Sequence, residues 1–373
     1  MKKKTVAMLM TVAMAATLMT GCGSQAETTA STEETTTEDT AAETDTEASE
    51  ETTEKNTDTA EAGAAYKVGI VQYVDDASLN QIEAAIEAEL DAKAAELGVT
   101  FDYADYTYNG QADATTLNQI ATELIASEVD VIVPIATPTA MIMQNATEDN
   151  QIPVVFSAVS DPVTAGLVDS LEAPGANITG TSDALNTEAV MDLMFAANPD
   201  ITKVGLLYNK SEDSSKAPIE AAIAYCEDKG VEVVEKTGTT NDEVSLAADA
   251  LIAAGVDAIF TPTDNTVMTA ELAIYEKFIE AGIPHYTGAD SFALNGAFLG
   301  FGVNYEELGT ATADIVADIL VNGADTASYS IVTLDNGIAT VNTETAEAIG
   351  LDYSMFADMC AEVKEITTAE EFE

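Results

Sequence analysis

The chain has 373 residues, of which 13 are basic and 66 are acidic, and its formal net charge is −53. Every basic residue is a lysine, and so acidic a chain lacks the basic face that nucleic-acid phosphates require, which excludes nucleic acid as a partner. About 300 residues follow the first aromatic residue, Tyr66, a length that suits two lobes rather than one small core.

Residues 1–21 have the pattern of a secretory signal peptide. Three lysines at positions 2–4 precede an apolar stretch from Val6 to Met19, which is too short for a permanent membrane span. The run that ends in Cys22 resembles the lipobox of bacterial lipoproteins, with Met19 where that motif usually has leucine. The resemblance implies that lipid is attached to the thiol of Cys22. We therefore expect an extracytoplasmic protein that contacts the cell membrane only through this lipid.

Residues 22–65 have the composition of a disordered acidic stalk. From residue 23 to residue 64 the segment is almost entirely Thr, Glu, Ala, Ser and Asp, and it contains no aromatic or branched aliphatic residue. Such a segment cannot bury enough apolar surface to offset the entropy lost on ordering. Repulsion between its carboxylates favours an extended chain.

From Tyr66 onward, short apolar runs alternate with segments whose apolar residues recur at helical spacing. In chain order, the first series predicts a strand at 67–72, a helix at 79–97, a strand at 99–103, a helix at 115–127, a strand at 129–134, a helix at 138–149 and strands at 153–158 and 177–180. The second series predicts a helix at 187–197, a strand at 203–208, a helix at 217–229, a strand at 231–235, a helix at 244–254, a strand at 257–261, a helix at 267–281 and strands at 284–287 and 298–301. A helix at 305–321 and strands at 330–333 and 338–341 complete the pattern.

This alternation predicts an α/β protein with two doubly wound parallel-sheet lobes. Ligands bind beyond the carboxyl ends of the strands in such sheets, so we expect the site in a cleft between the lobes. We assign residues 66–183 to the first lobe, with 303–325 returning to it. We assign residues 184–302 to the second lobe, with 326–355, and predict a C-terminal tail at 356–373.

The sequence offers little support for catalysis. The only histidine, His285, lies in a predicted strand without a Gly-x-Ser-x-Gly motif, and a lone histidine is usually structural. Walker A, dinucleotide-binding and calcium-loop motifs are absent from the sequence. Cys226 and Cys360 could be paired or free. We expect no enzyme activity, no catalytic residue, no metal site and no cofactor.

Motifs in and after the predicted strands resemble one bacterial family. They are VVF at 154–156, SDPV at 160–163, AGLV at 165–168, PGANITG at 174–180, VGLLYN at 204–209 and PTDNTV at 262–267. Over residues 66–351 the chain is similar to ABC transporter substrate-binding proteins, a family that includes members binding tryptophan and other aromatic amino acids. The resemblance implies the type I periplasmic-binding-protein fold, three hinge crossings, and delivery of a small solute to an ABC permease and its ATPase.

Two loops depart from the family's pattern. The family tends to carry His-Pro-x-Leu-Asp after the first strand, where this chain has DASLN at 76–80. The family tends to carry Glu-x-Asn-Ser after a Tyr-Asn pair, where this chain has EDSS at 212–215. Both loops are predicted to line the cleft, so the ligand of characterised members does not follow from the motifs alone.

An amino-acid ligand would need partners for both of its charges. Asp264 and Asp290, at the predicted rim of the second lobe, are candidates for the ammonium group. A carboxylate usually binds arginine, which this chain lacks, so its donors would be hydroxyls and helix N-terminal N–H groups near Thr137 and Ser160.

An aromatic ligand would stack on Tyr73, Phe156 or Tyr208. The predicted ligand-binding residues are Tyr73, Thr137, Ser160, Asp161, Tyr208, Ser214, Asp264, Asn265, Thr266 and Asp290. Simpler roles stay open for several of these side chains: helix capping for Asp264, a turn for Asp161 and, for the possible stacking partner Phe156, a place in the core.

The sequence thus predicts a monomeric, lipid-anchored receptor that closes its lobes around one small molecule and presents it to a permease. An aromatic amino acid is the leading ligand class. Another amino acid, a small polar solute, or a sensor that presents ligand to a signalling partner are the alternatives.

Overall fold

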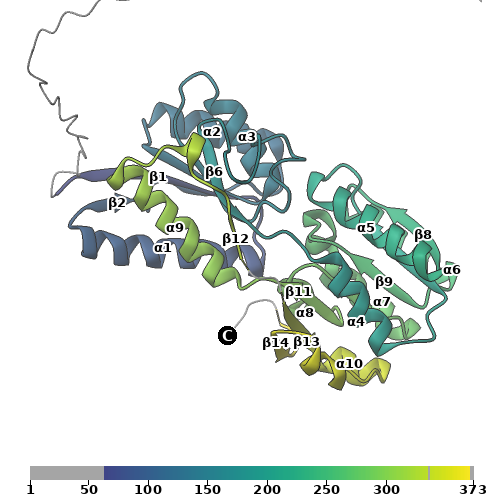
Figure 1. Cartoon of the computed structure of the whole chain (residues 1–373). Coiled ribbons are helices and arrows are strands. Elements are labelled where there is room, and N and C mark those ends of the chain that lie inside the picture. The colour runs from purple at the N-terminus through teal and green to yellow at the C-terminus, as the bar shows by residue number, and fades with distance from the viewer. Residues whose placement is uncertain (1–62, 335–336, 370–373) are drawn as a thin grey trace, which may run out of the picture. The chain divides into compact units, whose positions relative to one another are not determined.

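The structure is a computed structural model that describes residues 63–334 and 337–369 (Figure 1). The predicted signal peptide, Cys22 and nearly all of the predicted stalk lie outside the described residues. Within the described ranges, no helix has both the length and the apolar character needed to cross a bilayer.

The first lobe is built on a seven-stranded sheet in which every pairing is parallel. The strand order is β12-β6-β5-β4-β1-β2, and β3 also pairs with β1. The strands are β1 (Ala65–Gln72), β2 (Thr100–Asp102), β3 (Thr107–Asn109), β4 (Val131–Ile135), β5 (Val154–Phe156), β6 (Ile178–Ser182) and β12 (Val332–Thr333). The helices are α1 (Ala77–Leu97), α2 (Ala114–Ala126), α3 (Thr137–Thr147) and α9 (Tyr305–Asn322).

Apolar side chains on both faces of the strands explain this layering. Val68 and Ile70 of β1 pack in one core with α1 and α9, whereas Val71 packs with α2 and α3 on the opposite face. All five residues of β4 are buried, as expected for a strand covered on both sides. The prediction of two covered parallel sheets is therefore confirmed for this lobe.

The second lobe has a seven-stranded sheet of order β14-β13-β11-β10-β9-β7-β8. The strands are β7 (Lys203–Tyr208), β8 (Glu232–Thr237), β9 (Ala258–Thr261), β10 (His285–Thr287), β11 (Leu299–Gly302), β13 (Ile338–Asn342) and β14 (Glu362–Ile366). The helices are α4 (Thr187–Ala197), α5 (Asp213–Lys229), α6 (Asn241–Ala254), α7 (Asn265–Ala281), α8 (Asp290–Leu294) and α10 (Thr343–Ile349). Pairing is parallel except between β11 and β13.

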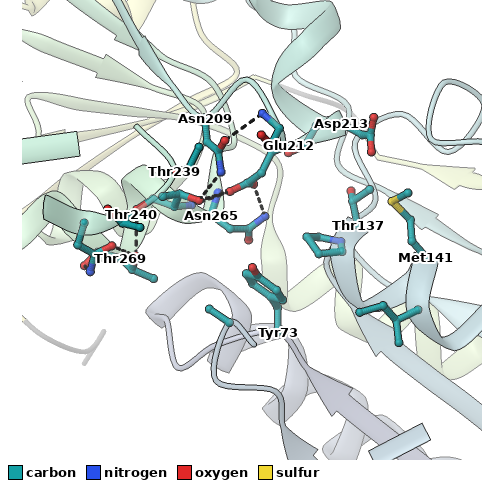
Figure 2. Close-up of a pocket in the computed structure, with 17 residues that line it drawn as sticks. Tyr73, Thr137, Met141, Asn209, Glu212, Asp213, Thr239, Thr240, Asn265 and Thr269 are labelled. Atoms are coloured by element: carbon teal, nitrogen blue, oxygen red, sulfur yellow. Dashed lines mark hydrogen bonds between the residues drawn. The ribbon is translucent and has the colours of Figure 1, made fainter. Parts of the chain in front are cut away.

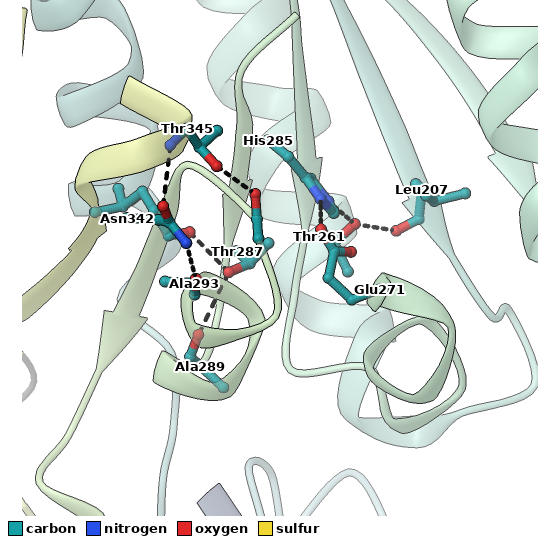
Figure 3. A network of polar contacts seen from close by, with 11 residues as sticks. Leu207, Thr261, Glu271, His285, Thr287, Ala289, Ala293, Asn342 and Thr345 are labelled. Carbon is teal, nitrogen blue, oxygen red and sulfur yellow. Dashed lines mark hydrogen bonds and ion pairs between the residues drawn. The ribbon is translucent and has the colours of Figure 1, made fainter. Parts of the chain in front are cut away.

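His285 of β10 links the second sheet to α7 through hydrogen bonds of its ring (Figure 3). Its Nδ1 lies 3.0 Å from Oε1 of Glu271, and its Nε2 lies 2.8 Å from Oγ1 of Thr261. The Thr261 hydroxyl donates to the Leu207 carbonyl at 2.9 Å, so Nε2 is the donor to Thr261. Buried and bonded through both ring nitrogens, His285 has the structural role expected from the sequence.

The chain passes between the two sheets three times: after β6, after β11 and after β12. The third passage corrects the predicted lobe boundary, because β12 pairs with β6 of the first sheet. Residues 326–333 therefore belong to the first lobe and not to the second. The two residues of β12 are too few to show which sheet they join.

The C-terminal segment is also different from the prediction of a tail at 356–373. Phe356 is fully buried in the core of the second lobe, and β14 pairs in parallel with β13. The short elements β3, α8 and α10 were not predicted, since three to seven residues do not establish a period. Cys226 and Cys360 are free thiols.

The lobes touch beside the second crossing, where Ser78 of α1 meets the N-terminus of α8. The hydroxyl of Ser78 donates to Oδ1 of Asp290 at 2.5 Å and accepts from the backbone N–H of Ser291 at 3.1 Å. Gln81 also donates to Asp290, at 3.2 Å. Because Ala289, the N-cap residue of α8, provides no capping side chain, Ser78 supplies the cap from the other lobe.

Helices α1 and α9 lie side by side in the first lobe (Figure 1). Gly309 of α9 marks their closest approach. A Cβ at this position would lie 2.5 Å from the carbonyl oxygen of Ile82 and 2.8 Å from the Cβ of Ala85. A glycine inside a helix is thus required by packing.

We expect Gly309→Ala to destabilise the protein, although alanine is the better helix former by about 1 kcal/mol. The added methyl group must push α9 away from the α1 backbone, and overpacking of this kind costs about 1–3 kcal/mol. Denaturant unfolding measures the change. Thr310→Ala, at the neighbouring half-buried position, is the control and should change stability little. A gain in stability for Gly309→Ala would contradict the close approach.

Candidate ligand-binding cleft

A cavity of about 450 Å³ is lined by loops of both lobes (Figure 2). We call it the Tyr73 cavity. The first lobe contributes an apolar wall of Tyr73, Pro138, Met141 and Ile142. The second lobe contributes hydroxyl, amide and carboxylate side chains. The predicted residues that line this cavity are Tyr73, Thr137, Ser214, Asn265 and Thr266.

Two more cavities adjoin it. A small central cavity of about 20 Å³ has Thr137, Ser160, Asp183 and Ser214 among its lining residues. A third cavity of about 440 Å³, the Pro218 cavity, is lined by Ser160, Asp161 and Ser214 together with mostly apolar side chains. Ser214 lines all three. The cleft is thus a series of neighbouring spaces with Ser214 at their junction.

Helix α3 begins at the cleft in an unusual conformation. Its N-cap residue, Ala136, has φ 78° and ψ 152°, a region that is essentially restricted to glycine. Within the described part of the chain no side chain caps this helix, and its second residue, Pro138, has no N–H group. The backbone N–H of Ala140 bonds to the Ala136 carbonyl, which leaves the N–H groups of Thr137 and Thr139 without a capping partner.

The N-terminus of α7 is, in contrast, occupied by two carboxylates. Asp264 accepts from the N–H groups of Val267 and Asn209 at 2.9 and 2.6 Å, and from the Ser215 hydroxyl at 2.7 Å. Asp264 is completely buried and lines none of the cavities described here. It therefore has the capping role that the sequence left open, and it is not placed to meet a ligand's ammonium group.

Glu212 completes this arrangement from the loop before α5. One carboxylate oxygen accepts from the N–H and the side-chain amide of Asn265, both at 2.9 Å. The other accepts from the N–H and the hydroxyl of Thr266, at 2.8 and 2.6 Å (Figure 2). Burial, with the charge of Glu212 as the next cause, raises the pKa of the Asp264 carboxyl. The role of Glu212 does not follow from the loop sequence in which it stands, because its partners lie more than fifty residues further along the chain.

Three other predicted ligand-binding residues, and the suggested stacking partner Phe156, lie away from the Tyr73 and central cavities. Asp290 is engaged in the contact with Ser78 between the lobes. The Tyr208 hydroxyl donates to Glu235 of β8 at 2.8 Å. Asp161 accepts from the N–H of Thr164 at 2.9 Å, as a turn residue does, and borders only the Pro218 cavity. Phe156 is fully buried in the core and provides no platform for a ligand.

Asp183, which sequence reasoning missed, is the one carboxylate among the residues that line the central cavity. It directly follows β6, at the first crossing between the lobes, and is 4% exposed. The Ser160 hydroxyl donates to its Oδ1 at 2.9 Å. Burial raises the pKa of Asp183 to about 6. Its position after an apolar strand was the signal available, but the predicted strand ended at residue 180.

Two aromatic hydroxyls border the same region. Burial raises the pKa of Tyr73 to about 12, and the carboxylates of Glu212 and Asp264 add to this effect. Tyr305, the first residue of α9, lines the central cavity. Burial, together with the charges of Asp183 and Asp290, raises the pKa of its hydroxyl well above the usual value. Both phenols therefore remain neutral at physiological pH.

Two doubly wound parallel-sheet lobes around a shared cleft define the type I periplasmic-binding-protein fold. The model of the ABC transporter substrate binding protein family matches residues 67–357, and the chain belongs to this family. It is a solute-binding protein and not an enzyme. The family predicted from the motifs is thereby confirmed.

Three relatives show what this chain is similar to. A tyrosine-binding protein of Clostridioides difficile (strain R20291) is 32% identical over 286 residues, which are 76% of this chain and 81% of that protein. An ABC domain from Streptococcus pneumoniae in complex with L-Trp has a TM-score of 0.74 and 28% identity, and the match covers 80% of this chain and all of the other. A ligand-free, open substrate-binding protein with adhesive properties from Clostridium difficile has a TM-score of 0.62 and 31% identity over 82% of this chain and all of the other.

The raised pKa values of two buried carboxyls predict that the folded protein is more stable in mild acid. Burial raises the pKa of Asp76 and of Asp183 to about 6, from 3.8. Between about pH 4 and pH 6 the folded protein thus holds protons that the unfolded chain has released, so stability falls as pH rises. We expect a higher Tm at about pH 5 than at about pH 7.5.

Thermal unfolding followed by circular dichroism at the two pH values checks this expectation. Asp183→Asn is the informative variant, because it keeps an oxygen that accepts from Ser160 and removes one titrating group. The difference in Tm should become smaller in this variant. A Tm that is equal or higher at the upper pH in the unaltered chain would show that the cleft carboxyls titrate normally.

Proposed function

We propose that this protein captures an aromatic amino acid, tyrosine or tryptophan, outside the cytoplasm and delivers it to an ABC permease and its ATPase. The observation that carries this proposal is a cleft whose central cavity is lined by one carboxylate, Asp183, and by the uncapped N-terminus of α3, beside an apolar wall that contains Tyr73. Relatives that align with the two-lobed part of the chain are a tyrosine-binding protein and an L-Trp complex, which supports the same ligand class.

Asp183 is the residue that we assign to the ligand's ammonium group. It lines the central cavity and is buried, so its charge is poorly screened by solvent. Its raised pKa of about 6 still leaves it ionised at neutral pH. An ammonium group bound beside it would stabilise the charged form and lower this pKa.

The ligand's ring is assigned to the wall formed by Tyr73, Met141 and Ile142. This wall faces the cavity from the first lobe (Figure 2), next to Thr137, which also lines the central cavity. Aromatic rings gain from offset or edge contacts with tyrosine and from contact with methionine sulfur. The second lobe would close on the opposite side, so that a bound solute stabilises the closed arrangement through contacts to both lobes.

A thermal-shift screen tests the ligand class. We expect L-tyrosine or L-tryptophan to raise the Tm of the chain carrying Cys22→Ser, since a ligand at 100 times its Kd adds about 2.7 kcal/mol of stability. L-Leucine, ribose and inositol serve as comparison solutes. A clear response to a sugar or polyol without any response to aromatic amino acids would refute the proposal.

Asp183→Asn should then weaken binding of the aromatic amino acid by about tenfold or more, because a buried charged partner is lost. Asp200→Asn, an exposed position on the loop after α4, is the matched control and should bind as the unaltered chain does. Isothermal titration at one pH measures both. Unchanged affinity in Asp183→Asn would remove this residue from the site.

The lipid anchor is the second part of the proposed function. Cys22 ends a run that resembles a lipobox, and residues 22–65 would tether the receptor at variable distance from the membrane. We expect cells fed a clickable palmitate to label the unaltered chain and not Cys22→Ser. Cys360→Ser is the control and should be labelled as usual. Labelling that persists in Cys22→Ser would contradict acylation at this position.

A further inference from the structure

We infer that the ligand's carboxylate is held without any cationic side chain, between the N-terminus of α3 in the first lobe and the hydroxyl of Ser214 in the second. This inference rests on the proposed function and assigns one end of its ligand. The chain contains no arginine, and no lysine lines the three cavities of the cleft. A carboxylate in this cleft must therefore be matched by neutral donors and by a helix dipole.

The N-terminus of α3 has the donors for this. The N–H groups of Thr137 and Thr139 have no capping partner, and the positive end of the helix dipole adds to their effect. Thr137 lines both the Tyr73 cavity and the central cavity, so the first turn of α3 reaches the centre of the cleft. The strained Ala136 is held in place by a hydrogen bond from its N–H to the Ser157 carbonyl at 3.0 Å.

Other helices that start near the cleft cannot take this role. The first N–H groups of α7 are bound by Glu212 and Asp264. The N–H of Ser291 in α8 is bound by Ser78. Helix α5 starts with Asp213 directly after Glu212, and this negative charge would repel an anion. Helix α3 is thus the cleft helix in the described residues whose N-terminus is both open and free of carboxylates.

An independent observation points to the same place from the other lobe. Ser214 is 4% exposed and lines all three cavities, yet its buried hydroxyl has no hydrogen-bond partner within the described part of the chain. Buried hydroxyls are nearly always paired, so an unpaired one that lines the cleft together with the open end of α3 indicates an absent acceptor.

A carboxylate supplies that acceptor and accounts for both features. One oxygen would accept from the N–H groups of α3, and the other from the Ser214 hydroxyl. The same group would then bind to both lobes, so that a free carboxylate favours closure. A ligand whose carboxylate is replaced by a neutral amide would lose the charge that matches the helix dipole, while its ammonium group still meets Asp183.

The experiment compares L-tyrosine with L-tyrosinamide, and L-tryptophan with L-tryptophanamide, by isothermal titration of the chain carrying Cys22→Ser. We expect the amide to bind at least about tenfold more weakly than the acid. In Ser214→Ala the affinity for the acid should fall and the ratio between acid and amide should shrink. Ser330→Ala, an exposed serine outside the cleft, should leave both unchanged.

The possible results separate this inference from the proposed function. Equal binding of acid and amide would overturn the carboxylate site and leave the aromatic ligand class intact. An unchanged ratio in Ser214→Ala would overturn the part assigned to Ser214. If neither acid nor amide binds, the proposed ligand class fails and the inference fails with it. The Tm values of the two ligand-free variants are compared first. If Ser214→Ala has the same Tm as Ser330→Ala, its change in affinity comes from the lost hydroxyl and not from a damaged fold.

Discussion

Each helix that follows a parallel strand begins at the cleft with unpaired backbone N–H groups, and the site depends on how these groups are satisfied. Asp76 caps α1 within its own lobe, whereas Ser78 caps α8 from the opposite lobe. Asp264 and Glu212 together occupy the start of α7. Among these helices, within the described residues, α3 has an N-terminus that is both uncapped and free of carboxylates, next to a residue held in strain. The same structural need thus yields a cap, a contact between lobes and the proposed carboxylate site.

The charge of the cleft limits which solutes fit it. Asp183 lines the central cavity, Asp76 and Asp264 are buried at helix N-termini, and burial raises the pKa values of all three because water no longer stabilises their charge. A bare anion would be repelled by such a site, and its lining offers no cationic side chain in return. An amino acid is neutral overall and carries its own cation, so its ammonium group can balance Asp183 while its carboxylate stays near a helix end.

Sequence patterns were sufficient for long elements and insufficient for pairings between distant residues. The helix at 187–197 and the strand at 203–208 have the predicted bounds, because their apolar residues recur at a regular period. The two-residue strand β12 has no period, so its sheet could not be predicted. Thr137 and Ser214 were found from their loops. The roles of Glu212 and Asp183 depend on which loops meet in space, which one sequence does not determine.

The cap that Ser78 gives to α8 has a consequence for exchanging parts between family members. Position 78 belongs to the first lobe by chain order, but its hydroxyl completes a helix of the second. A chimera that joins this first lobe to a relative's second lobe would place a serine opposite a helix that did not evolve with it. The boundary of such an exchange therefore does not follow the hinge. Residue 78 and helix α8 have to come from the same parent protein.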